Sequence, residues 1–111
     1  MNKRATRYFS DKQEKSVAKA VGGKQTANSG ATPFSKGDIS TKNFLIECKT
    51  STTEKQSFSI KKEWLKKNEE EAFAMGKFYS ALAFDFGDGE NHYVIDEELF
   101  ILLNRYIDEL Y

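Results

Sequence analysis

Two acidic residues and a lysine in the middle of the chain form the pattern best suited to chemistry. Asp38 follows Gly37, and the run Glu47-Cys48-Lys49 comes after eight further residues. Because side chains alternate along a strand, Glu47 and Lys49 are predicted to share one face. If Asp38 begins the neighbouring strand, two acids and a lysine converge at one edge of the sheet. Burying three such charges together is costly unless something binds between them, and a divalent metal ion is the usual ligand.

A plainer interpretation of these residues stays open. Asp38 could cap a turn, and Glu47 and Lys49 could form a solvated ion pair of the kind that is common on protein surfaces. Glu14 also has two interpretations. Its spacing places it beside the apolar stripe of the first predicted helix, where an acid is unusual. It could instead interact with the positive end of that helix.

The elements that must position these residues follow from turn signals and hydrophobic spacing. Helices are predicted over residues 11–21 and 59–75 and from Asp96 onward, and strands over 37–40, 43–50, 78–86 and 92–95. The run Ser10-Asp11-Lys12-Gln13 has a capping-box pattern, so the first helix is predicted to start there, after a basic segment 1–9 that forms a flexible arm or a docking segment. This order predicts a single α/β domain over residues 1–111, with a central mixed sheet flanked by helices.

The composition is that of a folded domain. Hydrophobic residues make up 39% and aromatic residues 14% of the 111 residues, which argues against disorder. No run of about 18 apolar residues is present, so no membrane-spanning helix and no membrane partner are expected. No apolar signal region follows the basic start of the chain, which predicts a cytoplasmic location. With one cysteine and one histidine, an internal disulfide is impossible and a Cys/His zinc site is implausible.

The charge is unevenly distributed although the formal net charge is zero. Residues 1–49 hold ten Lys or Arg and four Asp or Glu, whereas residues 50–111 hold seven and thirteen. The basic half contains the acid–acid–lysine residues, which suits a polyanionic substrate. Chance asymmetry in a small domain is the alternative explanation.

The motif residues resemble the core of the PD-(D/E)xK nucleases. They lie on a predicted helix–strand–strand–helix–strand order and comprise Glu14, Gly37-Asp38 and Glu47-Cys48-Lys49. The segment from Asn28 to Asp38 resembles the phage-encoded Holliday junction resolvases, and the chain is similar in length to the small resolvases of archaea and phages. The resemblance covers about residues 10–95. It departs from the family at Lys36-Gly37, where the family motif begins with proline.

The resemblance implies a restriction-endonuclease-like core and a structure-selective DNA endonuclease. Phosphodiester hydrolysis in this family needs Mg²⁺, or Mn²⁺, which takes the same oxygen ligands. The implied substrate is branched DNA, above all a four-way junction, whose two symmetric scissile positions imply a homodimer. The aromatic segment Phe78–Phe86 or the last helix could supply the dimer interface. If the chain is phage-encoded, the implied location is the cytoplasm of the host cell.

Within the motif, the resemblance implies a role for each residue. Asp38 and Glu47 are the implied metal carboxylates. The backbone carbonyl of Cys48 is the implied third ligand, and Glu14 would complete the metal shell from the first helix. Lys49 is implied to hold the attacking water or to stabilise charge in the transition state.

The family also uses a serine in the loop before the aspartate. Ser29 is the implied counterpart, aimed at the scissile phosphate, with Thr32 and Ser35 as competitors; Ser29 could also be a turn residue. Most side chains expected to contact DNA lie in the N-terminal half: Lys3, Arg4, Arg7, Lys24, Asn28, Ser29, Lys36 and Gln56. Gln56 could instead precede a helix N-terminus near Ser57.

Three rival functions remain open at this point. The first is a less structure-selective nuclease that acts on nicks, flaps, ends or invading DNA, because a fold core does not determine its substrate. The second is a DNA-binding module without catalysis, although a pure binder has no need for a cluster of acids. The third is an interaction domain with a charged strand pair.

Overall fold

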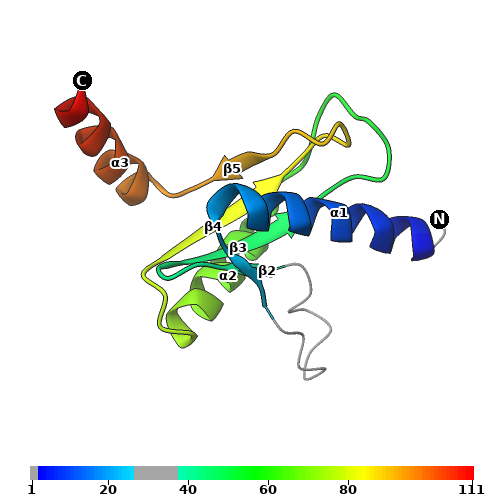
Figure 1. Ribbon diagram of the computed structural model, residues 1–111, viewed down its shortest axis with the longest axis horizontal. Helices are drawn as coiled ribbons and strands as arrows, with labels where there is room; N and C mark the ends of the chain where they lie inside the picture. Colours follow the sequence, from blue (N-terminus) through cyan, green and yellow to red (C-terminus); the bar gives the residue numbers. More distant parts are fainter. Residues whose placement is uncertain (1–2, 27–37) are drawn as a thin grey trace.

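The computed structural model describes residues 3–26 and 38–111, with side chains from Arg7 onward in the first segment. The elements in chain order are α1 (Lys3–Val21), β1 (Lys24–Gln25), β2 (Asp38–Ser40), β3 (Phe44–Lys49), α2 (Lys62–Ala74), β4 (Tyr79–Phe84), β5 (His92–Val94) and α3 (Glu97–Leu110) (Figure 1). This order confirms the predicted α/β class and mixed sheet. The short strand β1 was not predicted. Candidate residues that lie outside the described residues are Asn28, Ser29, Thr32, Ser35, Lys36 and Gly37.

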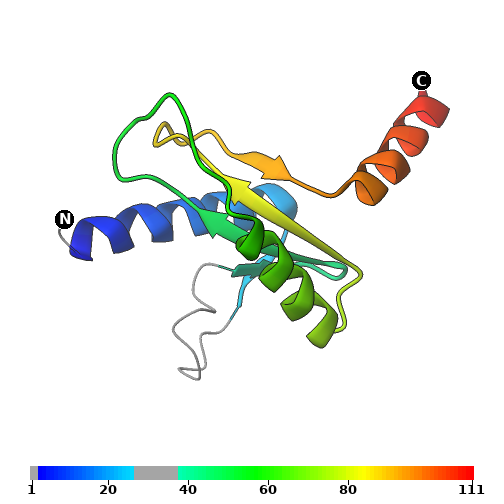
Figure 2. The ribbon, with the colours of Figure 1, turned by 180° about the vertical axis from the view of Figure 1, so that it is seen from behind.

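The five strands form one sheet in the order β1-β2-β3-β4-β5. Neighbouring strands run antiparallel except β3 and β4, which are parallel and in register from Phe44 opposite Tyr79 to Lys49 opposite Phe84. A parallel pair needs a crossover connection, and α2 supplies it. α1 lies in front of the sheet in Figure 1, and α2 lies in front in the reverse view of Figure 2, so the two helices cover opposite faces.

The main core lies between α1 and the sheet. Its buried members are Val17, Ile39, Ile46, Ala81 and Ala83. Along β3, the side chains of Phe44, Ile46 and Cys48 belong to this face. The alternation along a strand therefore turns Leu45, Glu47 and Lys49 toward α2. The apolar face is used for packing, which leaves the face with the charged residues for chemistry.

The predicted start of the first helix at residue 11 is wrong, because α1 already begins at Lys3. Residues 3–9 therefore continue the helix, and Ser10 lies inside it instead of capping it. The buried stripe of α1 reaches one turn further toward the N-terminus than predicted, because half-buried Phe9 lies four residues before Gln13, and Gln13 and Val17 are both buried.

The N-termini of α2 and α3 can be compared with the positions predicted from the sequence. α2 begins at Lys62, later than the predicted residue 59, so no helix N-terminus lies near Ser57, and Lys61 at the cap position makes no side-chain capping bond. The predicted cap of α3 is confirmed, because the Leu99 backbone N–H donates to Asp96 Oδ1 over 2.8 Å. In the described part of the chain, no helix is both long enough and apolar enough to cross a membrane.

Candidate active site

Asp38 and Glu47 lie directly opposite each other on the antiparallel strands β2 and β3. Opposed residues on paired strands project from the same face, so their carboxyl groups are neighbours on the α2 side of the sheet. The backbone of Asp38 is held by Thr26, whose N–H and Oγ1 both donate to the Asp38 carbonyl over 2.9 and 3.2 Å. Asp38 is only 5% exposed. These strand positions are those that the sequence predicted.

Lys49 reaches the same face two residues beyond Glu47. Its Nζ lies 3.4 Å from Glu47 Oε1 and 4.5 Å from the centroid of the Trp64 ring on α2. Lys61 Nζ lies 5.6 Å from the centroid of the same ring. The Lys49 side chain keeps 32% of its surface exposed. An acid and an aromatic ring therefore hold this ammonium group, which stays accessible from solvent.

Glu71 is a third acid at the site, which the sequence analysis missed. It belongs to α2, and its side chain is hydrogen-bonded to that of Asp38. Asn68 and Ala72 are the buried residues of α2, so Glu71 lies on the side of the helix that faces the sheet, whereas Glu69 and Glu70 are exposed. A run of three glutamates does not reveal which one turns inward, because this depends on the rotational phase of the helix.

Burial and crowding of like charges change the titration of these acids. The pKa of Asp38 is raised to about 8, first by burial and then by the charges of Glu71 and Glu47. Burial also raises the pKa of Glu47, although Lys49 acts in the opposite direction. Close carboxyl groups in a buried site cannot all ionise readily. The cluster therefore retains a proton near neutral pH until a cation compensates the negative charge.

Glu47 has one carboxyl oxygen available for a further ligand. Its Oε2 is buried and has no hydrogen-bond partner within residues 3–26 and 38–111. A buried carboxylate oxygen without a partner is costly, and a bound cation would remove that cost. The same described segments contain no group of three or more His, Cys, Asp or Glu side chains arranged to hold a metal ion. The donors fit a cation such as Mg²⁺, which is often bound by one or two carboxylates together with water and substrate phosphate.

The side chain of Cys48 and the residue Glu14 belong to the α1 side of the sheet. The Cys48 thiol belongs to the core on the α1 side, and burial raises its pKa. Burial also raises the pKa of Glu14, and Asp11, to which Glu14 is hydrogen-bonded, raises it further. The charges that act on Asp38 come from Glu71, Glu47 and Lys49. The charges that act on the Cys48 thiol include those of Glu14, Asp38 and Glu47, and the predicted role of Glu14 as a metal ligand stays a prediction.

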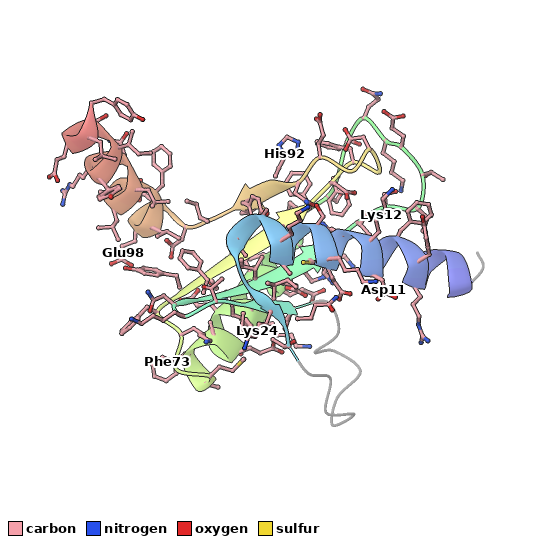
Figure 3. All side chains as sticks on the ribbon, in the orientation of Figure 1. Asp11, Lys12, Lys24, Phe73, His92 and Glu98 are labelled. Atoms are coloured by element: carbon pink, nitrogen blue, oxygen red, sulfur yellow. The ribbon has the colours of Figure 1, made fainter. Side chains whose placement is uncertain are left out.

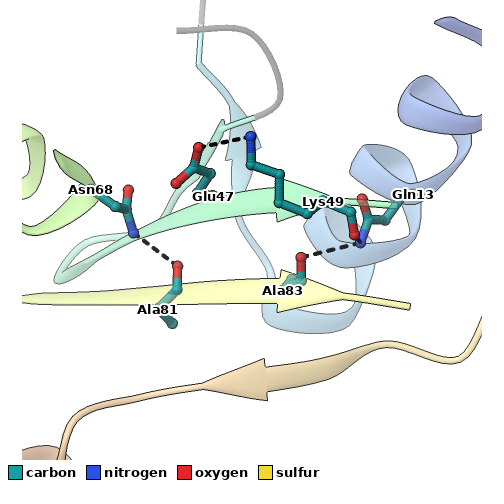
Figure 4. A network of polar contacts seen from close by, with 6 residues as sticks. All are labelled: Gln13, Glu47, Lys49, Asn68, Ala81 and Ala83. Carbon is teal, nitrogen blue, oxygen red and sulfur yellow. Dashed lines mark hydrogen bonds and ion pairs between the residues drawn. The ribbon is translucent and has the colours of Figure 1, made fainter. Parts of the chain in front are cut away.

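Gln13 connects α1 to both parallel strands next to the site. Its Nε2 lies 2.8 Å from the Lys49 carbonyl and 3.3 Å from the Ala83 carbonyl (Figure 4). The same nitrogen lies 3.2 Å from Asn91 Oδ1. The sequence analysis interpreted Gln13 as part of a helix cap, but it is 4% exposed and donates to the sheet. Gln13 therefore anchors the backbone of Lys49 from the α1 side of the sheet, whereas the Lys49 side chain lies on the α2 side.

A second buried amide performs the same task from α2. Asn68 Nδ2 donates to the carbonyl of Ala81 over 2.9 Å (Figure 4). It also donates to the carbonyl of Leu45 over 3.3 Å. Asn68 and Gln13 therefore bridge β3 and β4 from opposite faces of the sheet. Neither bridge was predicted from the sequence, because an amide in a helix gives no signal of the strands that it contacts.

The loops that follow β3 and β4 are also joined. Thr50 Oγ1 donates to Asp85 Oδ1 over 2.6 Å, and the Gly87 N–H donates to the same oxygen over 3.0 Å. The Lys55 N–H donates to the Phe86 carbonyl over 2.7 Å. These bonds hold the C-terminal ends of the two parallel strands together, next to the end of β3 that carries Lys49.

The residues predicted to contact DNA lie on several different elements of the structure. Arg7 on α1 and Lys24 on β1 are exposed, and Gln56 is exposed in the segment between β3 and α2. Lys3 and Arg4 belong to α1, but their side chains are outside the described part. Figure 3 shows Lys12 and Lys24 along the α1 and β1 side of the molecule.

Comparison with known proteins gives no relative. No family model matches the chain, and neither a curated protein nor a solved structure matches it significantly.

Proposed function

We propose that this chain is a metal-dependent endonuclease that hydrolyses phosphodiester bonds in branched DNA, with a four-way junction as the preferred substrate. The observation that carries the proposal is the pairing of Asp38 with Glu47 on adjacent strands, with Lys49 on the same face. Glu47 Oε2, buried without a partner in the described structure, supports a cation as the missing ligand. The resemblance of the motif to the PD-(D/E)xK nucleases supports the same chemistry.

The chain's own residues would divide the work as follows. Asp38 and Glu47 would hold the cation, which would be Mg²⁺ or Mn²⁺. When bound, that ion would neutralise charge on the phosphate and make a bound water more acidic. Lys49, held by Glu47 and Trp64, donates a hydrogen bond from Nζ to the attacking water or to a phosphate oxygen. Glu71, through its charge and its side-chain hydrogen bond, raises the pKa of Asp38 and so favours the protonated form of Asp38 while no cation is present.

The charge distribution supports a polyanionic substrate. Exposed basic side chains along α1 and β1 are Arg7, Lys12, Lys15, Lys19 and Lys24. Such a surface attracts the phosphate backbone without reading its sequence, which is what a structure-selective enzyme needs. A four-way junction has two equivalent scissile positions, so cutting both requires two copies of the site.

The decisive test is cleavage with Mg²⁺ of a labelled four-way junction, beside a linear duplex and a flap of matching sequence. Asp38→Asn and Lys49→Ala should lose cleavage and still bind the junction. Lys66→Ala removes an exposed lysine of α2 outside the cluster and is the matched control, with EDTA as a control for the metal.

Each result has a distinct meaning. Paired symmetric nicks in the junction alone support the proposal. Equal cutting of all three DNAs means a nuclease of broader substrate range. Tight junction binding without metal-dependent cutting means a DNA-binding module, and cleavage by Asp38→Asn at the parent rate means that the site is assigned to the wrong residues.

A further inference from the structure

Two buried side-chain oxygens have no hydrogen-bond partner among the described residues: Glu47 Oε2 and Asn68 Oδ1. Asn68 is only 3% exposed, and the side chain of Glu47 is 15% exposed. A buried acceptor without a donor has lost its hydration and gained no bond in exchange, which is costly. The metal site proposed above accounts for the oxygen of Glu47, whereas the oxygen of Asn68 still needs an explanation.

The orientation of the Asn68 amide is determined by the two strands that it bridges. Its Nδ2 donates to the carbonyls of Leu45 and Ala81, which can only accept hydrogen bonds. Turning the amide over would place Oδ1 against these two carbonyl oxygens, so only one orientation is favourable. Oδ1 must therefore point away from them, and Figure 4 shows it directed to the side on which the Glu47 carboxylate lies.

Asn68 and the acidic cluster belong to the same side of the sheet and the same face of α2. Glu71 follows Asn68 by three residues, which places the two side chains next to each other on the helix. Glu71 is hydrogen-bonded to Asp38, and Asp38 lies opposite Glu47. On the strand, the carbonyl that Asn68 contacts at Leu45 is two residues before Glu47. The helix and the strand therefore both place the Asn68 oxygen beside the acids.

We propose that Asn68 Oδ1 is a further ligand of the cation at Glu47, an inference that rests on the metal site of the proposed function. The cation would then be bound between β3 and α2, and not by the strands alone. Amide oxygens are suitable ligands for hard divalent cations. A neutral ligand also completes the coordination without adding charge to a site where three acids, Asp38, Glu47 and Glu71, already face Lys49.

A buried water molecule is the other group that could satisfy both oxygens, because one water can donate to two acceptors. Water would leave the negative charge of the acids uncompensated, whereas a cation compensates it. The two occupants also differ in what they predict. A water would hold the Asn68 amide in the same way at every concentration of Mg²⁺, but a cation makes the amide respond to Mg²⁺.

NMR of the parent chain tests this response without a substitution. The side-chain carbonyl carbon of Asn68 should shift in a saturable way as MgCl₂ is added, with the midpoint that calorimetry gives for Mg²⁺ binding. The side chain of Asn91, which contacts Gln13 and Ser16 on the α1 side, is the internal control and should not shift. An unmoved Asn68 signal despite calorimetric binding would overturn the role of Asn68 and leave the metal site standing. No binding by the parent chain would overturn both.

Two substitutions separate the oxygen of Asn68 from its strand contacts. Asn68→Ala and Asn68→Asp both remove the Nδ2 donor, so both should lower the midpoint of thermal unfolding in EDTA. Only Asn68→Ala also removes the oxygen, and its Mg²⁺ affinity should fall by at least tenfold, whereas Asn68→Asp should bind at least as tightly as the parent. Parent affinity in Asn68→Ala, or an equal loss in both variants, would mean that Asn68 only joins the strands and would overturn the inference.

Discussion

The ammonium group of Lys49 lies 4.5 Å from the centroid of the Trp64 ring, on the face of the sheet that carries Asp38 and Glu47. A cation over an aromatic face is attracted by the ring quadrupole, by about 0.5–2 kcal/mol. Trp64 is also the only tryptophan in the chain. The ring that positions the proposed catalytic lysine is therefore a fluorescent reporter of what happens at that lysine.

Adding Mg²⁺ to the parent chain should change the emission of Trp64 in a saturable way. A cation at Glu47 competes with Lys49 for the same carboxylate, so the ammonium group moves relative to the ring. Asp38→Asn removes one ligand and should weaken the apparent affinity by at least tenfold, about 1.4 kcal/mol. An identical titration curve for Asp38→Asn would contradict metal binding at this pair.

Without metal, Asp38→Asn should stabilise the protein at high pH. The folded-state pKa of Asp38 is about 8, well above its ordinary value, so the folded state binds the proton more tightly than the unfolded state. The free energy of unfolding of the parent should therefore fall as pH rises from about 4 to about 8. The gain of the variant should be near zero at pH 4 and about 1–3 kcal/mol at pH 8. Urea unfolding in EDTA measures it, and a constant difference at all pH values would contradict the raised pKa.

Glu71→Gln should lower the pKa of Asp38 by about one unit or more, because it removes a negative charge and supplies a hydrogen-bond donor. The carboxyl carbon of Asp38, followed by NMR without metal, reports this directly. Glu70→Gln changes the neighbouring exposed residue of the same helix and should leave the titration unmoved. Equal effects of both substitutions would mean that Glu71 acts only through the overall charge.

The sequence predicted half of the site because that half depends on local geometry. Strand alternation is enough to place Glu47 with Lys49, and the short turn before β3 is enough to bring Asp38 opposite Glu47. Glu71 could not be found in this way. Its inward direction depends on where α2 begins, and the helix was predicted to begin three residues too early, at residue 59.

The same holds for the fold: elements with a local sequence pattern were predicted, and features that depend on contacts between distant residues were not. Alternation and helical spacing located three helices and four of the five strands, and Asp96 was correctly predicted as a cap. The strand β1 is two residues long and pairs with β2 across the segment between them, so its residues carry no periodic signal. Gln13 was misinterpreted because its partners lie at Lys49 and beyond.

Gln13→Leu should lower the free energy of unfolding by about 2–3 kcal/mol, because it removes the donor that the buried carbonyls of Lys49 and Ala83 share. The side chains are similar in size, so packing changes little. Lys12→Leu, at the neighbouring exposed position, should change it by less than about 0.5 kcal/mol. Urea unfolding separates the two; similar losses would mean that the helix itself is sensitive.

Two glycines with the same backbone conformation offer a matched test of the loop after β4. Gly87 and Gly89 have φ of 87° and 83°, so alanine is strained at both. A Cβ at Gly87 would collide with the backbone of Thr53, whereas at Gly89 it meets open space. Gly89→Ala should cost about 1 kcal/mol and Gly87→Ala at least twice that. Equal losses in thermal unfolding would contradict the close approach.

The three bonds of Gln13 span 36, 70 and 78 positions of the chain. During synthesis, α1 emerges first. The side-chain amide of Gln13 can make all three hydrogen bonds only after Asn91 has been synthesised. A product truncated before β4 would contain Asp38, Glu47, Lys49 and Glu71 without the strand that aligns them. Assembly of the acidic cluster is therefore tied to completion of the sheet, and an unfinished chain would carry the reactive groups in an unassembled form.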